Sequence, residues 1–228
     1  MGRISAASSR TATRDSTLEK SGRARASRAG ARTMSRLRTE PRGHFPHGVT
    51  TMQPQLPINV DPDTGVWTTD ALPMLYVPRH FFTNNHVAVE EALGVEAYAE
   101  ILYKAGYKSA YHWCDKEAKL HGLTGMAVFE HYLKRLSQRG WGLFSIIEAD
   151  PASARAKIEL RHSSFVLQQP GKEGKLCYMF AGWFAGAMDW VNDTTPEGKG
   201  APRAQSKEVQ CAAEHHDHCV FEVSPIAH

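Results

Sequence analysis

The hydrophobic positions in the middle of the chain recur at the spacing that places them on one face of a helix. A short helix is predicted to begin at Asn84 or Asn85, either of which can cap it, and to end at Gly94. A long helix is predicted over 95–118, where apolar residues fall at i, i+3, i+4 and i+7 and charged residues occupy the other side. A third is predicted over 125–139. This part of the protein therefore buries helix faces that are rich in aromatic residues.

Beyond the third helix the hydrophobic period changes from that of helices to that of strands. An apolar run at 141–148 and an alternating segment at 156–165 are predicted to pair as antiparallel strands. An apolar helix is predicted at 176–191, with small residues that permit close packing, and a final hairpin from 207–213 and 218–223. The order of helices, two strands, helix and hairpin predicts an α+β fold in which helices pack on an antiparallel sheet.

The first 51 residues differ in composition from the rest. They contain ten arginines and one lysine against three acidic residues, a net charge of +8, and almost no large apolar side chains. Such a segment cannot bury enough surface to offset the entropy of ordering, so 1–51 is predicted to be a disordered basic tail. Two other interpretations stay open. One is a transit peptide, whose composition is similar, and the other is a start assigned too early, with Met34 or Met52 as the true initiator.

A single domain is predicted over 52–228, opening with a hairpin or extended arm at 53–78. Since the whole chain carries a net charge of +3, this domain is mildly acidic at −5, which disfavours binding to nucleic acid. No stretch approaches the roughly 18 uninterrupted apolar residues of a membrane helix, and no secretory signal precedes the four cysteines. We therefore expect a cytoplasmic protein with no membrane partner, whose cysteines are reduced or bind metal.

Three cysteines and a carboxylate lie close together in the C-terminal part of the sequence. Thiolate sulfur combined with oxygen or imidazole is the ligand set that tetrahedral zinc prefers, and a hairpin can bring two cysteines together from opposite strands. One candidate set is Cys177, Glu208, Cys211 and Cys219. Another replaces the glutamate by a histidine of the hairpin loop, His215, His216 or His218. The fourth cysteine, Cys114, lies on the apolar side of the long helix and is interpreted as a small hydrophobic side chain.

Strand geometry bears on the choice between the two ligand sets. Glu208 and Cys211 are three residues apart and point to opposite faces of an ideal strand, so both can bind one ion only if the strand bulges or ends between them. The spacing Cys211-x4-His216-x2-Cys219 is compatible with the histidine set. A metal-free interpretation, with buried free cysteines and a solvated histidine-rich turn, also stays open. Three thiolates and a carboxylate would fill the shell of the ion, which would then be structural.

Aromatic residues of the long helix and its neighbours predict a pocket for a small molecule. Ligand pockets are mostly apolar with a few polar groups, which tyrosine hydroxyls and a histidine can supply. The candidate ligand-binding residues are Tyr103, Tyr107, Tyr111, His112, Trp113, Phe129, Trp183 and Phe184. The same residues can instead form plain core, because aromatic side chains bury a large area whatever the function.

Other reactive side chains in the helical half carry weaker signals. His112 and His121, with Glu117 between them, could in principle form a second metal site. The pair Glu130 and His131 is interpreted as part of a solvated face. The sequence contains no glycine-rich phosphate loop, nicotinamide fingerprint or hydrolase motif, so we assign no catalytic residue.

The motifs at the C-terminal end resemble a known family. Residues 177–186 read Cys-aromatic-x-x-x-Gly-aromatic-x-Ala-Gly, and they are followed by Glu-x-x-Cys at 208–211 and, after seven residues, by Cys-x-Phe-Glu at 219–222. This series resembles the C-terminal part of the 4-vinyl-reductase domain family, which also occurs as the effector-sensing module of aromatic-responsive bacterial activators. The stretch Ile-Leu-Tyr-Lys-Ala-Gly-Tyr at 101–107 is similar to a helix motif near the start of those domains. The resemblance spans roughly 78–225.

The resemblance implies both a zinc site and a bound ligand. In zinc-bearing members, the positions that match Cys177, Glu208, Cys211 and Cys219 are the ligand set, which favours Glu208 over the histidines. The resemblance also implies an α+β fold, a homodimer, and a small apolar or aromatic molecule held between helices and sheet.

The function expected from this resemblance is a zinc-stabilised small-molecule-binding domain, acting as a sensor or accessory for another protein. A weaker similarity to uncharacterised bacterial proteins that accompany the breakdown of N-methylated amines supports an alternative. In that alternative the chain is an accessory or catalytic subunit of a reductase or N-methyl amine demethylase system, with a redox protein as partner. A third interpretation has the pocket collapsed and the domain acting as a dimeric assembly piece.

Overall fold

The computed structural model describes residues 56–227. The predicted tail at 1–51 and the first residues of the predicted arm lie outside the described residues. The elements are, in chain order, β1 (Asn59–Val60), β2 (Trp67–Thr69), β3 (Leu72–Met74), α1 (Arg79–Leu93), α2 (Val95–His121), α3 (Met126–Gln138), β4 (Leu143–Asp150), η1 (Pro151–Ser153), β5 (Arg155–Arg161), α4 (Ser164–Gln168), η2 (Tyr178–Phe180), α5 (Ala181–Thr194), β6 (Ala204–Gln210), η3 (Ala212–Glu214) and β7 (Cys219–Pro225), where η marks a 3₁₀ turn.

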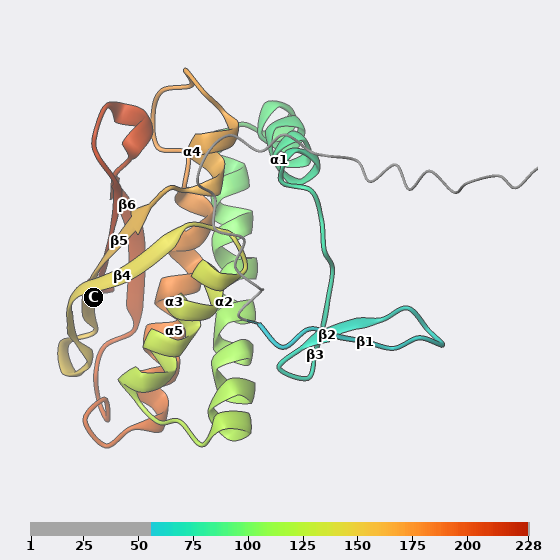
Figure 1. Cartoon of the computed structure of the whole chain (residues 1–228). Coiled ribbons are helices and arrows are strands. Elements are labelled where there is room, and N and C mark those ends of the chain that lie inside the picture. Colours follow the sequence, from blue (N-terminus) through green and yellow to red (C-terminus); the bar gives the residue numbers. More distant parts are fainter. Residues whose placement is uncertain (1–55, 228) are drawn as a thin grey trace, which may run out of the picture. The chain divides into compact units, whose positions relative to one another are not determined.

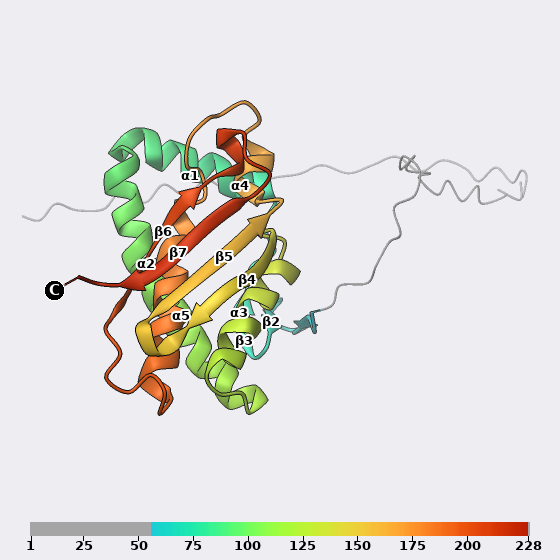
Figure 2. The ribbon, with the colours of Figure 1, turned by 90° about the vertical axis from the view of Figure 1, so that its left-hand side faces the viewer.

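The main body has two layers, a four-stranded antiparallel sheet in the order β4-β5-β7-β6 and a layer of helices that covers one face of it. Figure 1 shows α2, α3 and α5 beside the sheet, and Figure 2 shows the uncovered face of the sheet with the helices behind it. Along β5, Ala156, Ile158 and Leu160 are buried and alternate with more accessible residues. The predicted α+β fold with helices on an antiparallel sheet is confirmed.

The segment before α1, predicted as a hairpin or extended arm, forms a small three-stranded antiparallel sheet in the order β1-β2-β3. The turn between β2 and β3 places Asp70 at φ 53° and Ala71 at φ 58°, a left-handed pair typical of tight hairpins. Although it lies in a turn, the side chain of Asp70 is buried and forms an ion pair with Arg135 of α3. The tip of this hairpin is thereby attached to the helical layer.

Several predicted boundaries were wrong, among them that of the strand predicted over 207–213, which runs from Ala204 to Gln210. α1 begins at Arg79 rather than near residue 84, because Pro78 stands at its N-cap position and fixes an extended backbone there. β5 ends at Arg161 instead of continuing to residue 165, because His162 has a left-handed φ of 54° and Ser163 then caps α4 by accepting a hydrogen bond from the Phe165 amide. The apolar segment predicted as a helix at 176–191 begins with η2, and α5 proper starts at Ala181.

Glycines allow α2 and α5 to approach each other closely. A Cβ atom added to Gly182 or Gly186 would lie closer than 3.0 Å to the backbone carbonyl of Tyr103 or Tyr107, respectively. Only glycine fits where two helix backbones meet at this separation. The close packing that the small residues predict is therefore present, and it fixes the position of α5 beneath the sheet.

The space between helices and sheet is filled largely by aromatic rings. Edge-to-face and stacked ring pairs link residues from β4, α4, η2, α5 and β7 into one cluster. Its members include Trp141, Phe144, Phe165, Phe180, Trp183, Phe184 and Phe221. Among the helices in residues 56–227, none has the length and apolar character needed to cross a bilayer.

A partly buried polar network joins α1 to η2. The Tyr178 hydroxyl donates a hydrogen bond to Glu90 Oε2 at 2.8 Å and lies 3.1 Å from Nε2 of His86. Lys172 forms an ion pair with the other oxygen of Glu90 at 2.7 Å, and the ring of Tyr98 contacts the imidazole of His86. The helix that precedes α2 is thus held to the rest of the domain by charged and hydroxyl groups as well as by apolar contacts.

We expect the free energy of unfolding to fall as the pH drops below about 6.5, in part because of His86. Burial lowers the pKa of His86 below its ordinary value of 6.5, with Glu90 opposing that shift and Lys172 adding to it. Between the two pKa values the unfolded chain binds a proton that the folded chain excludes, so acid favours unfolding. Urea unfolding of the wild type and His86→Gln between about pH 7.5 and pH 5.5 tests this. The variant should lose less stability over that interval, and an equal loss in both proteins would contradict the prediction.

Candidate metal centre

The structure brings Cys177, Glu208, Cys211 and Cys219 together at one end of the main sheet. All four residues are buried, and their donor atoms all lie within 4.8 Å of one another. Cys177 directly precedes η2, Glu208 lies near the end of β6, Cys211 follows that strand, and Cys219 begins β7. The hairpin of β6 and β7 therefore supplies three donors, and the segment leading into α5 supplies the fourth.

A backbone irregularity lets Glu208 and Cys211 face the same point. The register of β6 against β7 shifts between Glu208 and Gln210, and the strand ends at Gln210. Cys211 then stands at the N-cap of η3 rather than inside the strand. Either a bulge or a strand end would satisfy the glutamate set, and the structure contains both.

The sulfur positions match the geometry of tetrahedral zinc. Sγ of Cys219 lies 3.7 Å from Sγ of Cys177 and 3.8 Å from Sγ of Cys211. Sulfur ligands about 2.3 Å from a tetrahedral zinc ion would lie about 3.8 Å from each other. None of the described cysteines forms a disulfide. The sulfur separations thus suit three thiolates around one ion.

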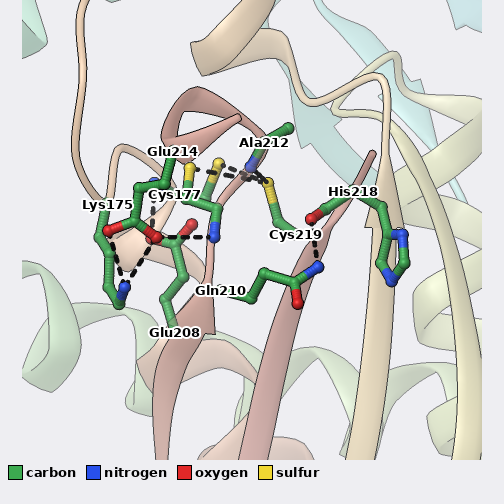
Figure 3. Close-up of polar contacts among 9 residues, drawn as sticks. Lys175, Cys177, Glu208, Gln210, Ala212, Glu214, His218 and Cys219 are labelled. Carbon is green, nitrogen blue, oxygen red and sulfur yellow. Dashed lines mark hydrogen bonds and ion pairs between the residues drawn. The ribbon is translucent and has the colours of Figure 1, made fainter. Parts of the chain in front are cut away.

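Hydrogen bonds orient three of the four donor residues, Cys177, Glu208 and Cys219, which Figure 3 labels. The Cys177 amide donates to Glu208 Oε2 at 2.9 Å, while Glu208 Oε1 is buried and has no hydrogen-bond partner among residues 56–227. The Ala212 amide donates to Cys219 Sγ at 3.3 Å, and Ser163 Oγ lies 3.0 Å from Cys177 Sγ. An unpaired carboxylate oxygen inside a buried site costs stability unless a cation or another donor meets it. Glu208 Oε1 therefore fits the role of the oxygen ligand.

The electrostatics of the cluster are compatible with a bound cation. Burial and then repulsion from Cys211 raise the pKa of Glu208 to about 9. Hydrogen bonds from Cys177 and Cys219 lower the pKa of the Cys211 thiol, and the bond to Cys211 raises the pKa of Cys177. Four acidic groups in one buried site cannot all ionise unless positive charge is supplied. A divalent ion would let three thiolates and a carboxylate coexist.

The hairpin histidines do not belong to the cluster. His215 is exposed and lies 3.6 Å from Glu173, and His216 is also exposed. His218 lies 3.5 Å from Glu159, and its ring points away from the sulfur atoms (Figure 3). The structure therefore groups Glu208, and none of these histidines, with the three cysteines.

The predicted ligand-binding residues separate into groups. Tyr103, Tyr107 and Tyr111 follow one another at four-residue intervals along α2 and face α5 and β6. Their hydroxyls are hydrogen-bonded, in that order, to the amide of Ser206 at 3.3 Å and to the carboxylates of Asp189 at 2.5 Å and Asp193 at 3.0 Å. Trp113, Phe129 and Phe184 are buried in the core, while the half-buried Trp183 packs over Gly106. Three of the eight side chains, Tyr107, Tyr111 and His112, line one surface groove.

Two surface grooves lie near these residues. One of about 440 Å³ includes three of the predicted ligand-binding residues and is lined by Tyr107, Lys108, Tyr111, His112, Asp115, Asp193 and Arg203. The other, of about 760 Å³, runs between α3 and β4 and is lined by Glu130, Leu133, Lys134, Ser137, Gln138, Leu143, Phe144, Ser145 and Ile146. Sequence reasoning missed the second groove because it forms only when α3 packs beside an edge strand.

A second group of metal-ligating side chains differs from the one that the sequence suggested. Glu117 and His121 lie together, but their third member is His131 and not His112. His112 is nine residues before His121, which places it on the opposite side of α2. The interpretation of His131 as part of a solvated face was wrong, because it lies 2.9 Å from the buried carboxylate of Glu117. Glu130 is exposed as expected.

Cys114 lies outside both clusters. It is fully buried in the core, and burial raises the pKa of its thiol far above the ordinary value. Its interpretation as a small hydrophobic side chain is consistent with this environment.

Comparisons with known proteins place the fold. Residues 52–147 match a family model described as a domain of unknown function (DUF5943), a stretch that ends before the four-residue cluster. No curated protein sequence is significantly similar to the chain. Solved structures that are similar at low sequence identity include the following three.

The crystal structure of the phenol-responsive sensory domain of the transcription activator PoxR with phenol is 12% identical, with a TM-score of 0.60 over 74% of this chain and 84% of that one. A trafficking protein particle complex subunit 3 from Naegleria fowleri, covalently bound to palmitic acid, is 14% identical with a TM-score of 0.43 over 64% and 93% of the two chains. A vinyl-4-reductase family protein from Methanocaldococcus jannaschii is 15% identical with a TM-score of 0.42 over 68% and 85%. The first of these supports, at the level of the fold, the likeness to effector-sensing domains that the sequence motifs indicate.

Proposed function

We propose that this chain is a zinc-stabilised domain that binds a small aromatic or apolar molecule, acting as a sensor or accessory for another protein. The observation that carries the ligand part is the fold shared with a sensory domain whose structure contains phenol. The Cys₃Glu cluster carries the zinc part. Zinc would be held by Cys177, Glu208, Cys211 and Cys219.

The proposed role of zinc is structural. Three sulfurs and one carboxylate oxygen complete a tetrahedral shell, so no coordination position is left for substrate or reacting water. The ion would fasten the hairpin of β6 and β7 to the segment that leads into α5. Cys177 and Cys219 are 42 residues apart in the sequence. An ion bound to both would therefore link two distant segments of the chain, as a covalent crosslink would.

The proposed ligand site is the groove of about 440 Å³ that includes Tyr107, Tyr111 and His112. Its volume lies within the range of about 300 to 1,000 Å³ typical of small-molecule sites. Tyrosine faces can stack on an aromatic ring, and Asp193 or Arg203 can hydrogen-bond a hydroxyl group such as that of phenol. The remaining predicted residues would support the groove from the core. A homodimer and a redox-protein partner stay predictions.

Phenol should raise the melting temperature of the zinc-loaded protein by a few degrees once its concentration is well above the dissociation constant, because it binds only the folded state. Thermal denaturation of the wild type, Tyr111→Ala and Leu143→Ala is the measurement. Tyr111→Ala should abolish the shift, whereas Leu143→Ala, in the groove between α3 and β4, should retain it.

The outcomes of this experiment separate the alternatives. Loss of the shift only in Leu143→Ala would move the ligand to the groove between α3 and β4 and reject the proposed site. Absence of a shift with phenol and related small aromatics in the wild type would reject the ligand proposal. A flavoprotein that co-purifies with the chain, in that case, would favour the accessory subunit of a reductase or demethylase.

A further inference from the structure

A second cluster of metal-ligating side chains lies where α2 ends and α3 packs against it. Oε2 of Glu117 is 3.2 Å from Nε2 of His121 and 2.9 Å from Nε2 of His131. The three donor atoms all lie within 4.8 Å of one another. Neither the proposed zinc site nor the proposed ligand groove includes any of these residues.

The secondary structure explains why the three side chains converge. Glu117 and His121 are one turn apart and share a face of α2. Gly122, in a left-handed conformation with φ 64°, ends that helix and lets the chain turn back into α3, which presents His131. The ring of His131 also stacks on Trp113, with centroids 5.6 Å apart and planes 21° apart. The imidazole is therefore held in one orientation by packing.

The cluster is buried on one side and open on the other. The side chain of Glu117 is fully buried, that of His131 is 17% exposed and that of His121 is 33% exposed. An ion could therefore enter from solvent past His121 and reach the carboxylate behind it. This differs from the Cys₃Glu cluster, in which every donor residue is buried.

Two buried carboxylate oxygens beside the cluster are unsatisfied. Oε1 of Glu117 and Oδ2 of Asp70 have no hydrogen-bond partner within the described part of the chain. Oδ1 of Asp70 lies 3.7 Å from Nε2 of His121 and accepts a hydrogen bond from Arg135 at 2.8 Å. The other oxygen of Asp70, Oδ2, lies 3.7 Å from the guanidinium group of Arg139. A buried oxygen that lacks a partner destabilises the fold. The unsatisfied oxygen of Glu117 is an independent indication that a positively charged group belongs here.

The charged groups beside the cluster include both carboxylates and guanidinium groups. Two guanidinium groups, of Arg135 and Arg139, flank Asp70 and Glu117, so the two carboxylates have two cationic neighbours. Arg135 is hydrogen-bonded to Asp70, which holds that carboxylate beside the cluster rather than in it. Oε2 of Glu117 instead faces the two imidazoles, and its Oε1 has no hydrogen-bond partner within the described residues. Its carboxylate is thus the anionic donor best placed to bind a cation.

We propose that Glu117, His121 and His131 bind a divalent transition-metal ion. Two imidazole nitrogens and one carboxylate oxygen are donors that zinc, iron(II) and cobalt(II) accept. Three protein ligands leave at least one coordination position for water or a small anion, on the exposed side of His121. The site is therefore exchangeable, in contrast to the closed Cys₃Glu site, and it stands independently of the proposed function.

Cobalt(II) titration of the purified full chain tests this proposal, because the two kinds of site have different absorption spectra. Cobalt bound by cysteine produces sulfur-to-metal charge-transfer bands in the near ultraviolet, and cobalt bound by histidine and carboxylate produces only weak visible bands. With zinc already in the cysteine site, the wild type should bind one further equivalent of cobalt without charge-transfer bands. His121→Ala should bind it more than about 100-fold more weakly, since loss of a group that only supports a metal ligand costs 10- to 100-fold.

The matched control is His112→Ala, which removes an exposed histidine of the same helix on the opposite side. It should bind cobalt as the wild type does, and circular dichroism should show that both variants are folded. Glu117→Gln, which keeps the size of the side chain but removes its charge, provides a second variant with the same expected loss. Equal cobalt binding by wild type, His121→Ala and Glu117→Gln would overturn the proposal, as would wild-type cobalt binding that appears only with charge-transfer bands.

Discussion

Cys219→Ala is expected to abolish binding of the proposed zinc ion and to lower the free energy of unfolding by more than about 4 kcal/mol, a loss large enough to leave the C-terminal hairpin poorly folded. The reason is that binding energy at a structural zinc site is also folding energy. Cys219 lies 3.7 and 3.8 Å from the two other sulfurs and is fully buried, so its loss removes one ligand and leaves two thiols and a carboxylate without a common partner. Metal content by mass spectrometry and stability by urea unfolding are the measurements.

Cys114→Ala is the matched control for this experiment. Cys114 is as fully buried as Cys219 but lies in the helical core, away from the cluster. It should keep one zinc per chain and lose only about 1 kcal/mol, the cost of a small core truncation. Purified wild type with well below one zinc per chain would reject the metal centre, and so would a Cys219→Ala protein that retains its zinc.

Gly182→Ala is expected to destabilise the fold by about 2 kcal/mol or more, even though alanine favours helices. The new Cβ would meet the carbonyl group of Tyr103, which belongs to the backbone of α2 and cannot rotate away. Overpacking of a core typically costs about 1–3 kcal/mol and sometimes more, while the better helix propensity of alanine returns at most about 1 kcal/mol. Urea unfolding measures the net effect.

Gly106→Ala provides the comparison. Its Cβ would meet chiefly the side chain of Trp183, which can shift, so the loss of stability should be smaller than for Gly182→Ala. Gly186→Ala, which meets the carbonyl of Tyr107, should resemble Gly182→Ala. If Gly182→Ala were as stable as the wild type, the close contact of α2 and α5 would not be the feature that holds these helices in place.

The elements that sequence patterns predicted well are those whose determinants are local. The long amphipathic pattern located α2 and α3 closely, because a helix face shows in the spacing of its own residues. The start of α1 and the end of β5 were predicted wrongly, since they depend on Pro78 and on the left-handed backbone of His162, whose effects the apolar pattern does not record.

The candidate sites also combine features that local sequence patterns predict with features that they do not. The residues able to bind zinc could be selected from their types and spacing, although the choice between Glu208 and the hairpin histidines depended on family resemblance. The sequence identified the aromatic residues of the predicted pocket, but these residues do not all line the same groove. Trp113, Phe129 and Phe184 pack in the core, whereas Tyr107, Tyr111 and His112 line a surface groove. Periodicity identifies a buried face but not what that face is buried against.

By itself, the sequence determined the α+β order of elements and the set of side chains with the chemistry to bind a metal, because composition and periodicity are properties of short segments. Only the tertiary structure decided which donors meet. A strand bulge and the end of β6 turn Glu208 and Cys211 toward Cys177 and Cys219, and the packing of α3 on α2 brings His131 to Glu117 in place of His112. These meetings depend on register and helix packing between distant segments, which no local pattern encodes.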